Sequence, residues 1–492
     1  MSQLVLNSNL IKSNSARRSN ILSAIITKEL REMYRDRRLV ALSLFIVILS
    51  LAAILFGFTE NSRLARERVA AAKADQLLWT GQGAKNPHAA AHFGQYAFKP
   101  VSPLSFIDPG VNPYVGTSVW LEAHKQNETQ FRSARDKGLA GRLGGLSAAY
   151  ILQTIAPLLI LLVSFMSFTG ERENGTLRQL LSLGVKPAEL LIGKALSFNI
   201  LILVLIFPLV AFSAIAIASF NNTINFSLSD QLVRLIIMAL GYCLYLTGFA
   251  FLGLGFSAIS KNSRAALISL LAFWLINSFL APRLITDIAR SYAPTPTALE
   301  FRSAIAQDKA KTFGHDETHP AFVLFRNEIL KKYNVARIED LPVNFRGLQL
   351  HRDDEAGYQI FDKHFSALQE SFNRQDWLRT APGFLFPILA ITPFSMAFAG
   401  TDSLAQYDFT LTAEAHRRNI QNEVSDNIIN FAHNDSYVSG PELWKRIASF
   451  SYRSPSIYFA LDHSLEAIFM LLSWVAVTII FALLSVRNLR PI

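Results

Sequence analysis

Cysteine is almost absent from this sequence. Cys243 is the single cysteine among 492 residues, and it lies within an apolar run. A disulfide within the chain is therefore excluded, so any exported part must be held together by packing alone. Charged residues make up only 17% of the chain, and few of them interrupt the long apolar runs. This scarcity argues against a proton-coupled carrier, which needs buried carboxylates for its proton relay.

Motifs of enzyme active sites are also missing. The pair Gly193–Lys194 lacks the earlier glycine of a phosphate-binding P-loop, and Ala195 follows it in place of Ser or Thr. Serines in the apolar runs, such as Ser164 and Ser197, have no G-x-S-x-G motif around them, which argues against an intramembrane protease. We therefore expect no catalytic residue and no ATP site on this chain.

Two histidine pairs have the spacing of metal ligands. His88 and His92 lie four apart in HAAAH, and His315 and His319 lie four apart in HDETH. Neither segment is H-E-x-x-H, and no third ligand is evident in the sequence. We interpret these side chains as surface or locally hydrogen-bonded histidines, so no metal site is expected.

Long hydrophobic runs dominate the chain. Hydrophobic residues make up 51% of it, clustered in runs of about 20 residues, the length that crosses roughly 30 Å of hydrocarbon. Many basic residues lie at the ends of these runs, so the net charge of +10 favours membrane topology rather than nucleic-acid binding. The predicted fold is an all-α polytopic membrane protein with six transmembrane helices and a mainly helical periplasmic domain formed by two insertions.

The expected division of the chain follows these runs. Predicted spans are 39–58, 148–168, 197–220, 232–259, 265–281 and 465–485, with insertions at 59–147 and 282–463. The remaining segments 1–38, 169–194 and 486–492 are then cytoplasmic. Basic residues at the ends of the runs set this orientation, and they are Arg35, Arg37, Arg38, Lys261, Arg264, Arg487 and Arg490. Pro157 should kink the second span, and Pro282 should end the fifth.

A seventh apolar run, 381–400, is long enough to span a bilayer. It contains Pro382, Pro387 and Pro393, which would remove backbone donors in lipid. A seventh span would also place Arg487 and Arg490 outside. We interpret the run as a membrane-hugging or re-entrant piece of the second insertion.

Patterns within the insertions predict further helices. Segments 63–78 and 118–127 are expected to be helical. Two buried helical seams are also predicted, the first made of Tyr358, Phe361, Phe365, Leu368 and Phe372, the second of Ile420, Val424, Ile428 and Phe431.

Segment 169–194 stands out because it is charged and lies between two spans. Its leucines form an apolar stripe, and Glu171, Arg172 and Glu173 add a charged rim. Residues 20–38 form a second amphipathic pattern, typical of a helix lying along the membrane surface. In the fourth span, Gly241, Gly248 and Gly255 recur every seven residues on one face, which indicates a close helix–helix contact, although such glycines are also common in membrane helices without one.

The pattern E-x-E-x-G-T-L-x-x-L-L, followed by Gly-Lys at the next span, resembles the coupling segment of class-two (ABC-2) ABC exporter permeases. All six spans fit this resemblance. Within this family, the sequence resembles a bacterial branch with a large uncharacterised periplasmic domain. The resemblance to that branch rests on segments of the two insertions, which are NPHAAAHFGQYAFKP, DPG, LEAH, EDLPVNFRG, SMAFAGTD and AEAHRR. That branch is similar to the nitrous-oxide-reductase maturation and gliding-motility permeases.

The resemblance implies a permease in the bacterial inner membrane, with both termini cytoplasmic. A second permease chain, identical or related, would pair with it, and a dimer of separate ATPase subunits would carry ATP and magnesium, so no cofactor is expected here. Membrane lipids and a periplasmic protein are further expected partners. The implied ATPase-coupling residues are Glu171, Arg172, Glu173, Gly175, Thr176, Leu177 and Leu180. The interfacial helix would pack beside them through Ile25, Leu30, Arg31 and Tyr34.

Two functions of different classes stay open at this point. The chain is either an exporter subunit, which moves a substrate across the membrane, or a mechanical transmitter. As a transmitter it would use ATPase motion to remodel or recruit a periplasmic protein without transport. A polar cavity between the spans at the dimer axis would favour export, and a sealed apolar seam would favour transmission.

Overall fold

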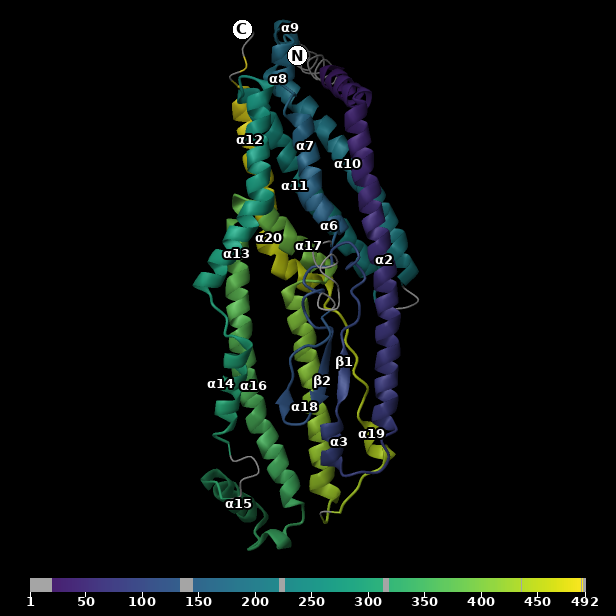
Figure 1. Cartoon of the computed structure of the whole chain (residues 1–492), viewed down its shortest axis with the longest axis vertical. Helices are drawn as coiled ribbons and strands as arrows, with labels where there is room; N and C mark the ends of the chain where they lie inside the picture. Colours follow the sequence, from purple (N-terminus) through teal and green to yellow (C-terminus); the bar gives the residue numbers. More distant parts are fainter. Residues whose placement is uncertain are drawn as a thin grey trace, which may run out of the picture.

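The computed structural model describes residues 20–132, 145–220, 226–312, 318–434, 436–487 and 489. Its long helices run along one axis, with α8 (Thr169–Glu173) and α9 (Thr176–Ser182) at one end and α15 (Pro320–Tyr333) at the other (Figure 1). We refer to these as the α9 end and the α15 end. Among the described residues, seven helical segments are long and apolar enough to cross a membrane. The all-α polytopic fold class therefore fits, and the seventh segment is Ile388–Phe431.

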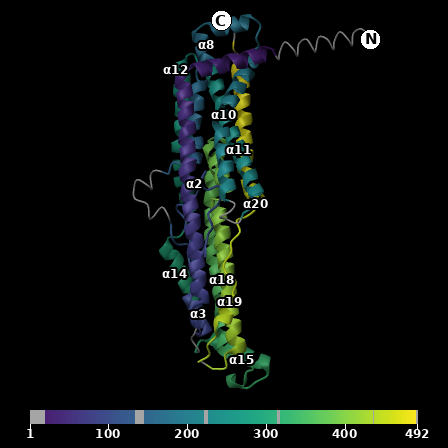
Figure 2. The same ribbon diagram turned by 90° about the vertical axis from the view of Figure 1, so that its right-hand side faces the viewer.

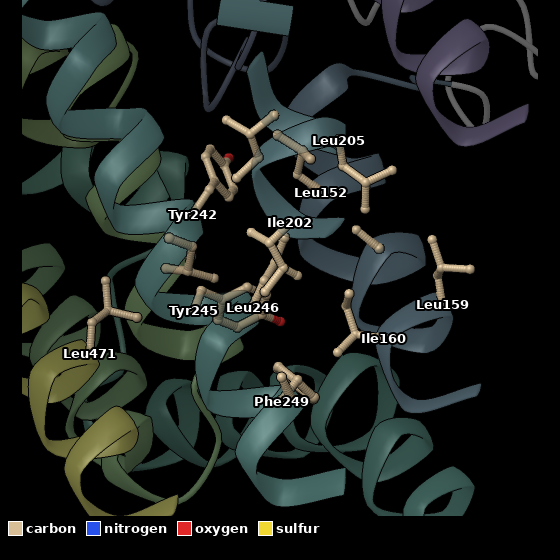
Figure 3. Packing of buried hydrophobic residues seen from close by; sticks show 14 of the residues in the cluster. Leu152, Leu159, Ile160, Ile202, Leu205, Tyr242, Tyr245, Leu246, Phe249 and Leu471 are labelled. Atoms are coloured by element: carbon tan, nitrogen blue, oxygen red, sulfur yellow. The ribbon is translucent and has the colours of Figure 1, made fainter. Parts of the chain in front are cut away.

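The bundle at the α9 end is organised around α11 (Leu228–Ile259). This helix packs against α10 (Pro187–Phe220), α20 (Ile457–Val486) and α7 (Ala156–Ser164). Its side chains Tyr245, Leu246 and Phe249 are fully buried between these neighbours (Figure 3). Large apolar side chains at helical spacing thus fill the centre of the bundle, while the outer faces of the same helices stay apolar and exposed, as expected in lipid.

Two of the spans contain a π-helical turn beside a proline. In the second span, η1 (Ile151–Ile155) separates α6 (Ala148–Tyr150) from α7, and Pro157 lies in the first turn of α7. In the fifth, η2 (Ile276–Leu280) links α12 (Ser263–Leu275) to α13 (Ala281–Tyr292). The prediction that Pro282 ends the fifth span is wrong, because the helix continues to Tyr292. In both spans the π-helical turn widens the backbone directly before the proline. Each proline then lies in the first turn of an α-helix, where its missing backbone N–H group is not needed for a hydrogen bond.

The first span belongs to a much longer helix, α2 (Arg37–Thr80). The carboxylate of Asp36 caps it by accepting from the backbone N–H groups of Arg38 and Leu39. Its 44 residues extend about 66 Å, twice the thickness of the hydrocarbon core. The predicted helix 63–78 is therefore the second half of α2, and its surface carries ion pairs such as Arg63 with Glu60. One rigid rod runs from the bundle almost to the α15 end (Figure 1).

A small antiparallel sheet lies beyond the bundle. It has the order β1-β2-β3, formed by β1 (Gln95–Phe98), β2 (Ser118–Glu122) and β3 (Lys125–Gln126). The helix predicted at 118–127 is wrong. In this stretch Val119 and Leu121 are buried, while Trp120 faces the other side and lies opposite Tyr96 in the strand register. Alternation with period two and a paired neighbour favour a strand there.

Both insertions contribute to one hydrophobic core beside this sheet. Helical parts of the second insertion are α14 (Ala298–Lys309), α15, η3 (Ile338–Asp340), α16 (Phe345–Thr380), η4 (Ala381–Phe384), α17 (Ile388–Ala399), α18 (Ser403–Phe431) and α19 (Pro441–Arg446). The shared core joins Trp79 and Leu121 of the first insertion to Phe409 and Trp444 of the second. Short α3 (Pro87–Phe93) covers this core next to α18.

The two predicted seams are buried only in part. In α18, Ile420, Val424 and Ile428 are buried, whereas Phe431 is exposed. In α16, Phe361 is buried, but Phe372 is 41% exposed, so the prediction of a single buried seam is wrong there. The reason is that α16 packs against α18 and α14 through part of its length only, and the remainder borders an open groove.

Residues 381–400 enter the bundle and turn back. The backbone N–H of Ile388, where α17 begins, donates to Asn277 in the middle of the fifth span (3.3 Å). At the other end of α17, Arg234 in the first turns of α11 donates to the Phe398 carbonyl (3.4 Å). Helices α16 and α18 both leave toward the α15 end (Figure 1). The segment thus forms the tip of a hairpin lodged between α11 and α20.

Candidate coupling site

The charged segment between the second and third spans forms a tight corner at the α9 end. Helix α8 ends at Glu173, and Gly175 then adopts a left-handed conformation (φ 76°) and begins α9. Left-handed backbone is easily reached only without a Cβ, so the glycine of E-x-E-x-G-T-L lets the chain reverse here. Leu177 is buried under the corner, and Gly184, also left-handed (φ 81°), closes it before α10.

Helix 20–35 lies across this corner, along the end of the bundle (Figure 2). Ile25 is buried against Gly193, where an added Cβ would overlap the Ile25 side chain. The first half of the Gly-Lys pair is thus required for close approach of this helix to α10. Arg31 and Tyr34 are exposed, Tyr34 by 80%, and Leu30 is half-buried.

Four alternating charges lock helix 20–35, α8 and α10 together. Lys194 Nζ donates to Glu29 Oε1 (2.7 Å) and to Glu171 Oε1 (2.9 Å). Lys28 Nζ donates to the same two carboxylates, at 2.7 Å to Glu171 and 3.1 Å to Glu29. The cluster is neutral, and the Lys194 side chain is only 1% exposed. Buried charges are tolerated when they are paired in this way.

The electrostatics of the cluster favour its charged form. Burial by itself lowers the pKa of Lys28, but hydrogen bonds and opposite charges of Glu171 and Glu29 outweigh it and raise that pKa above its usual range. Lys28 therefore stays protonated. The ion pairs of the cluster consequently tie three helices together.

The next two residues of the motif tie α8 to the turn between α11 and α12. Arg172 donates to the carbonyls of Ser260 (2.5 Å) and Ala258 (2.8 Å), the last acceptors of α11. Glu173 accepts from the backbone N–H (2.7 Å) and the hydroxyl (2.8 Å) of Ser263, where α12 begins. A cation at a helix C-terminus and an anion at an N-terminus both complement the helix dipoles.

The motif residues therefore divide into an internal and an external set. Glu171 and Leu177 are buried, and Arg172 and Leu180 are half-buried, so these four act inside the joint. Glu173, Gly175 and Thr176 are exposed at its tip. Five further residues are exposed on the same tip but were not assigned to coupling from the sequence, although Arg178 and Leu183 belong to its charged and apolar pattern: Asn174, Arg178, Gln179, Ser182 and Leu183. Sequence reasoning also did not assign Lys28, Glu29 and Lys194 to the coupling site. A Lys and a Glu in an amphipathic segment near the end of a span could have indicated an ion pair there.

The three glycines of α11 all lie against other helices. A Cβ on Gly241 would overlap the Phe394 ring of α17, and one on Gly248 would overlap the Trp474 indole of α20. A Cβ on Gly255 would meet Phe481, also of α20. Flat aromatic rings thus lie directly on the α11 backbone at these positions.

The histidine pairs have different surroundings. His319 caps α15, where its Nδ1 accepts from the Ala321 N–H (3.2 Å), and His315 lies outside the described residues. His88 and His92 lie on α3, and the fold brings His124 of the β2–β3 turn next to them. A third potential metal ligand, which the sequence did not reveal, is therefore present beside this pair.

Comparison with known families supports the architecture. Residues 23–340 match the ABC-2 family transporter protein model, and residues 298–453 match a domain of unknown function, DUF3526. No curated protein matches the chain. The first match includes most of helix 20–35, the α8–α9 corner and the first five spans, and covers more than half of the sequence. Members of this family are permeases that normally work with an ATP-binding subunit. The chain therefore belongs to the ABC-2 transporter family and is a multi-pass membrane component of an ABC transporter.

Proposed function

We propose that this chain is the permease subunit of an ABC exporter in the bacterial inner membrane. A separate ATPase dimer docks on the exposed tip of α9, and a second permease chain, identical or related, completes the transporter. Both termini are cytoplasmic in this proposal. The observation that carries it is the ion-paired joint, because it ties the base of the exposed tip to helix 20–35, α10, α11 and α12.

An ion-paired joint between helix 20–35, α8 and α10 is rigid enough to transmit a displacement of α9 to the spans. Removing one partner from a buried ion pair costs about 3–5 kcal/mol, so ordinary thermal motion leaves the cluster intact. Arg172 and Glu173 add charged hydrogen bonds to the ends of α11 and α12. A partner that pushes α9 therefore moves the ends of several spans as one body, which is the rigid-body class of conformational change.

The motion has two routes to the α15 end. Helix α2 is continuous from the bundle to the shared outer core, where Trp79 is fully buried. The hairpin of α16, α17 and α18 is rooted in the bundle by the contact of Phe394 with Gly241 and by Arg234. Displacement of α11 against α20 would thus tilt the hairpin, and the outer domain would follow.

We assign six spans to the membrane and treat 381–400 as a re-entrant tip. Support comes from the hairpin geometry, since α16 and α18 leave on the same side. Helix α17 of this segment is also shielded from lipid, because Ala390, Ile391 and Phe398 are fully buried between neighbouring helices, whereas Phe384 and Leu385 before it are exposed. Irregular backbone is tolerated at membrane depth where protein surrounds it. In this assignment the domain made of both insertions is periplasmic.

The transmitter function stays the second candidate, favoured by an observation on the outer domain. A groove of about 1460 Å³ extends along α16 and α18 and is bordered by Phe372, Trp377 and Tyr407. Aromatic side chains and arginine are enriched at protein-binding surfaces, and Arg417 and Arg418 also line the groove. A periplasmic protein held in this groove would experience the tilting of the hairpin, with or without a transported substrate.

Docking at the α9 tip can be tested with exposed residues, because their replacement does not disturb the joint. Arg178→Glu and Leu183→Asp change the tip, and Leu183 is 76% exposed. We expect both variants to lose the ATPase subunit during gentle purification from native membranes and to lose permease-stimulated ATP hydrolysis, while the thermal midpoint Tm is unchanged.

The matched control is Arg337→Glu, which changes another exposed arginine, near the α15 end. It should retain the ATPase. If the tip variants retain the ATPase as well, the docking surface is assigned wrongly. Mass spectrometry of the wild-type complex also separates the two functions: a bound periplasmic protein supports transmission, whereas an ATPase and permease pair alone supports export.

A further inference from the structure

Three histidines from separate parts of the first insertion meet at one point of the outer domain. His88 and His92 occupy successive turns of α3, and His124 lies in the turn between β2 and β3. Their ligand nitrogens all lie within 4.8 Å of one another. The ring centroids are 4.7 to 5.3 Å apart. Among the described residues, this is the group of three or more potential ligands that could hold a metal ion.

The spacing of the closest pair suits a shared metal. Nε2 of His88 and Nε2 of His92 are 3.2 Å apart. Two nitrogens at about 2.0–2.1 Å from a tetrahedral zinc ion are separated by about 3.3–3.4 Å, as the tetrahedral angle requires. The ligand nitrogen of His124 lies within 4.8 Å of the other two, so metal binding would require it to move closer to them. A direct N–H···N hydrogen bond between His88 and His92 has a similar length, and it is the competing explanation.

A buried carboxylate orients the third histidine. Asp354 of α16 is 5% exposed, and its Oδ1 lies 2.8 Å from Nδ1 of His124. A carboxylate on the far nitrogen fixes the tautomer and leaves Nε2 as the ligand atom, the arrangement found behind metal-bound histidines. The His124 carbonyl also accepts from Lys309 Nζ (2.7 Å), which holds the turn in place.

We propose that His88, His92 and His124 bind one divalent transition-metal ion of the zinc class. Imidazole ligands favour zinc and its neighbours, whereas calcium and magnesium require oxygen ligands. Three protein ligands leave a fourth position, and the exposed ring of His92 shows that this side is open to water or an incoming ligand.

The site has a structural consequence in a chain that has no disulfides. The metal would fasten α3 to the β2–β3 turn, both in the first insertion. Through Asp354 it would also hold α16 of the second insertion. A metal crosslink of this kind stabilises the folded domain, because the separated ligands of the unfolded chain bind it weakly.

The test uses the full chain in detergent, purified without a polyhistidine tag and freed of metal with a chelator. Zn²⁺ should bind at one ion per chain and raise Tm. Co²⁺ should give the visible absorption bands of a tetrahedral complex. His92→Ala removes an exposed ligand and should lose the stoichiometric ion and the cobalt spectrum. Asp354→Asn should keep the stoichiometry but weaken binding about 10–100-fold.

The matched control is His351→Ala, which removes a half-buried histidine of α16 outside the cluster and should bind like wild type. The proposal is overturned if wild type binds no zinc, or if His92→Ala and wild type bind it equally. Either result would assign the cluster to the hydrogen-bonded histidine pair. An unchanged Tm of His92→Ala without metal confirms that the variant is folded.

Discussion

Lys194 forms ion pairs with two other helices, which a neutral residue at this position could not form. Its ammonium group bridges Glu29 of helix 20–35 and Glu171 of α8, while its own backbone belongs to α10. Lys28 shares both carboxylates but is 39% exposed, so water and salt screen its contribution. Most of the ionic stabilisation of the joint therefore depends on the single buried lysine.

Lys194→Met should destabilise the joint, because Glu29 and Glu171 then carry an uncompensated negative charge. We expect a loss of about 3–5 kcal/mol in the free energy of unfolding, measured as a lower Tm. The second change Glu171→Gln removes the excess charge and should restore part of the loss. Lys186→Met, an exposed lysine of the same segment, is the control and should leave Tm unchanged. Equal Tm values for both lysine variants would contradict the ionic tie.

Lys99 is a buried lysine with a different environment. Its Nζ donates to Gln406 Oε1 (2.9 Å) and Asn112 Oδ1 (3.2 Å), both uncharged. Burial lowers the pKa of Lys99 to about 8, from 10.5, and the charge of Asp402 opposes this only in part. The folded state therefore releases this proton at a lower pH than the unfolded state.

The sign of the pH effect follows from proton binding. Between pH 8 and pH 10.5 the unfolded chain binds more protons at Lys99 than the folded chain does, so stability from this group rises with pH. The gain amounts to up to about 3 kcal/mol. The Tm of wild type minus that of Lys99→Met should accordingly increase across this window. A constant difference would show that Lys99 has an ordinary pKa.

At the scale of elements, the glycines of α11 decide how the bundle packs. Gly248 lies under the Trp474 indole, whose Nε1 also donates to the Tyr245 carbonyl (3.2 Å). Helices approach closely in membranes where small residues allow backbone contact. The contact between α11 and α20, the most extensive between any two helices of the described chain, is built on this fit.

Gly248→Leu should separate α11 from α20, because the new side chain occupies the space of the indole. Overpacking of this kind costs about 1–3 kcal/mol, and we expect a lower Tm and reduced permease-stimulated ATP hydrolysis. Ile236→Phe adds bulk to the lipid-facing side of the same helix, where the residue is 54% exposed, and should have little effect. If Gly248→Leu behaves like this control, the close contact is not important for packing.

At the scale of the whole molecule, the α9 and α15 ends are proposed to lie on opposite sides of the membrane. Single cysteines at Ser182 in α9 and Ser366 in α16 test this in a Cys243→Ser background, since both serines are exposed. In intact spheroplasts, an impermeant thiol reagent should label the cysteine at 366 and spare the cysteine at 182. Permeabilised cells, in which both should react, provide the control. The reverse pattern would invert the topology.

Local patterns determined much of this protein. Apolar runs of membrane-spanning length predict the bundle, since each helix satisfies its own backbone in lipid. Amphipathic spacing predicts helix 20–35, and Glu171–Leu177 predicts a charged corner between two spans. Pro282 and segment 118–127 were predicted wrongly. A π-turn accommodates the proline, and pairing of Trp120 with Tyr96 overrides local helix preference.

Only the tertiary structure shows which residues distant in the sequence are in contact. Glu171 is far in sequence from Lys28, and His124 is far from His88, so neither the charge cluster nor the histidine cluster is visible as a motif. Burial reassigned Glu171 from the charged rim to the interior of the joint, where Leu177 of the apolar stripe is also buried. The physical reason is the same in each case. A linear pattern records hydrophobicity and backbone preference, whereas charge pairing and metal ligation depend on distances between side chains that folding alone sets.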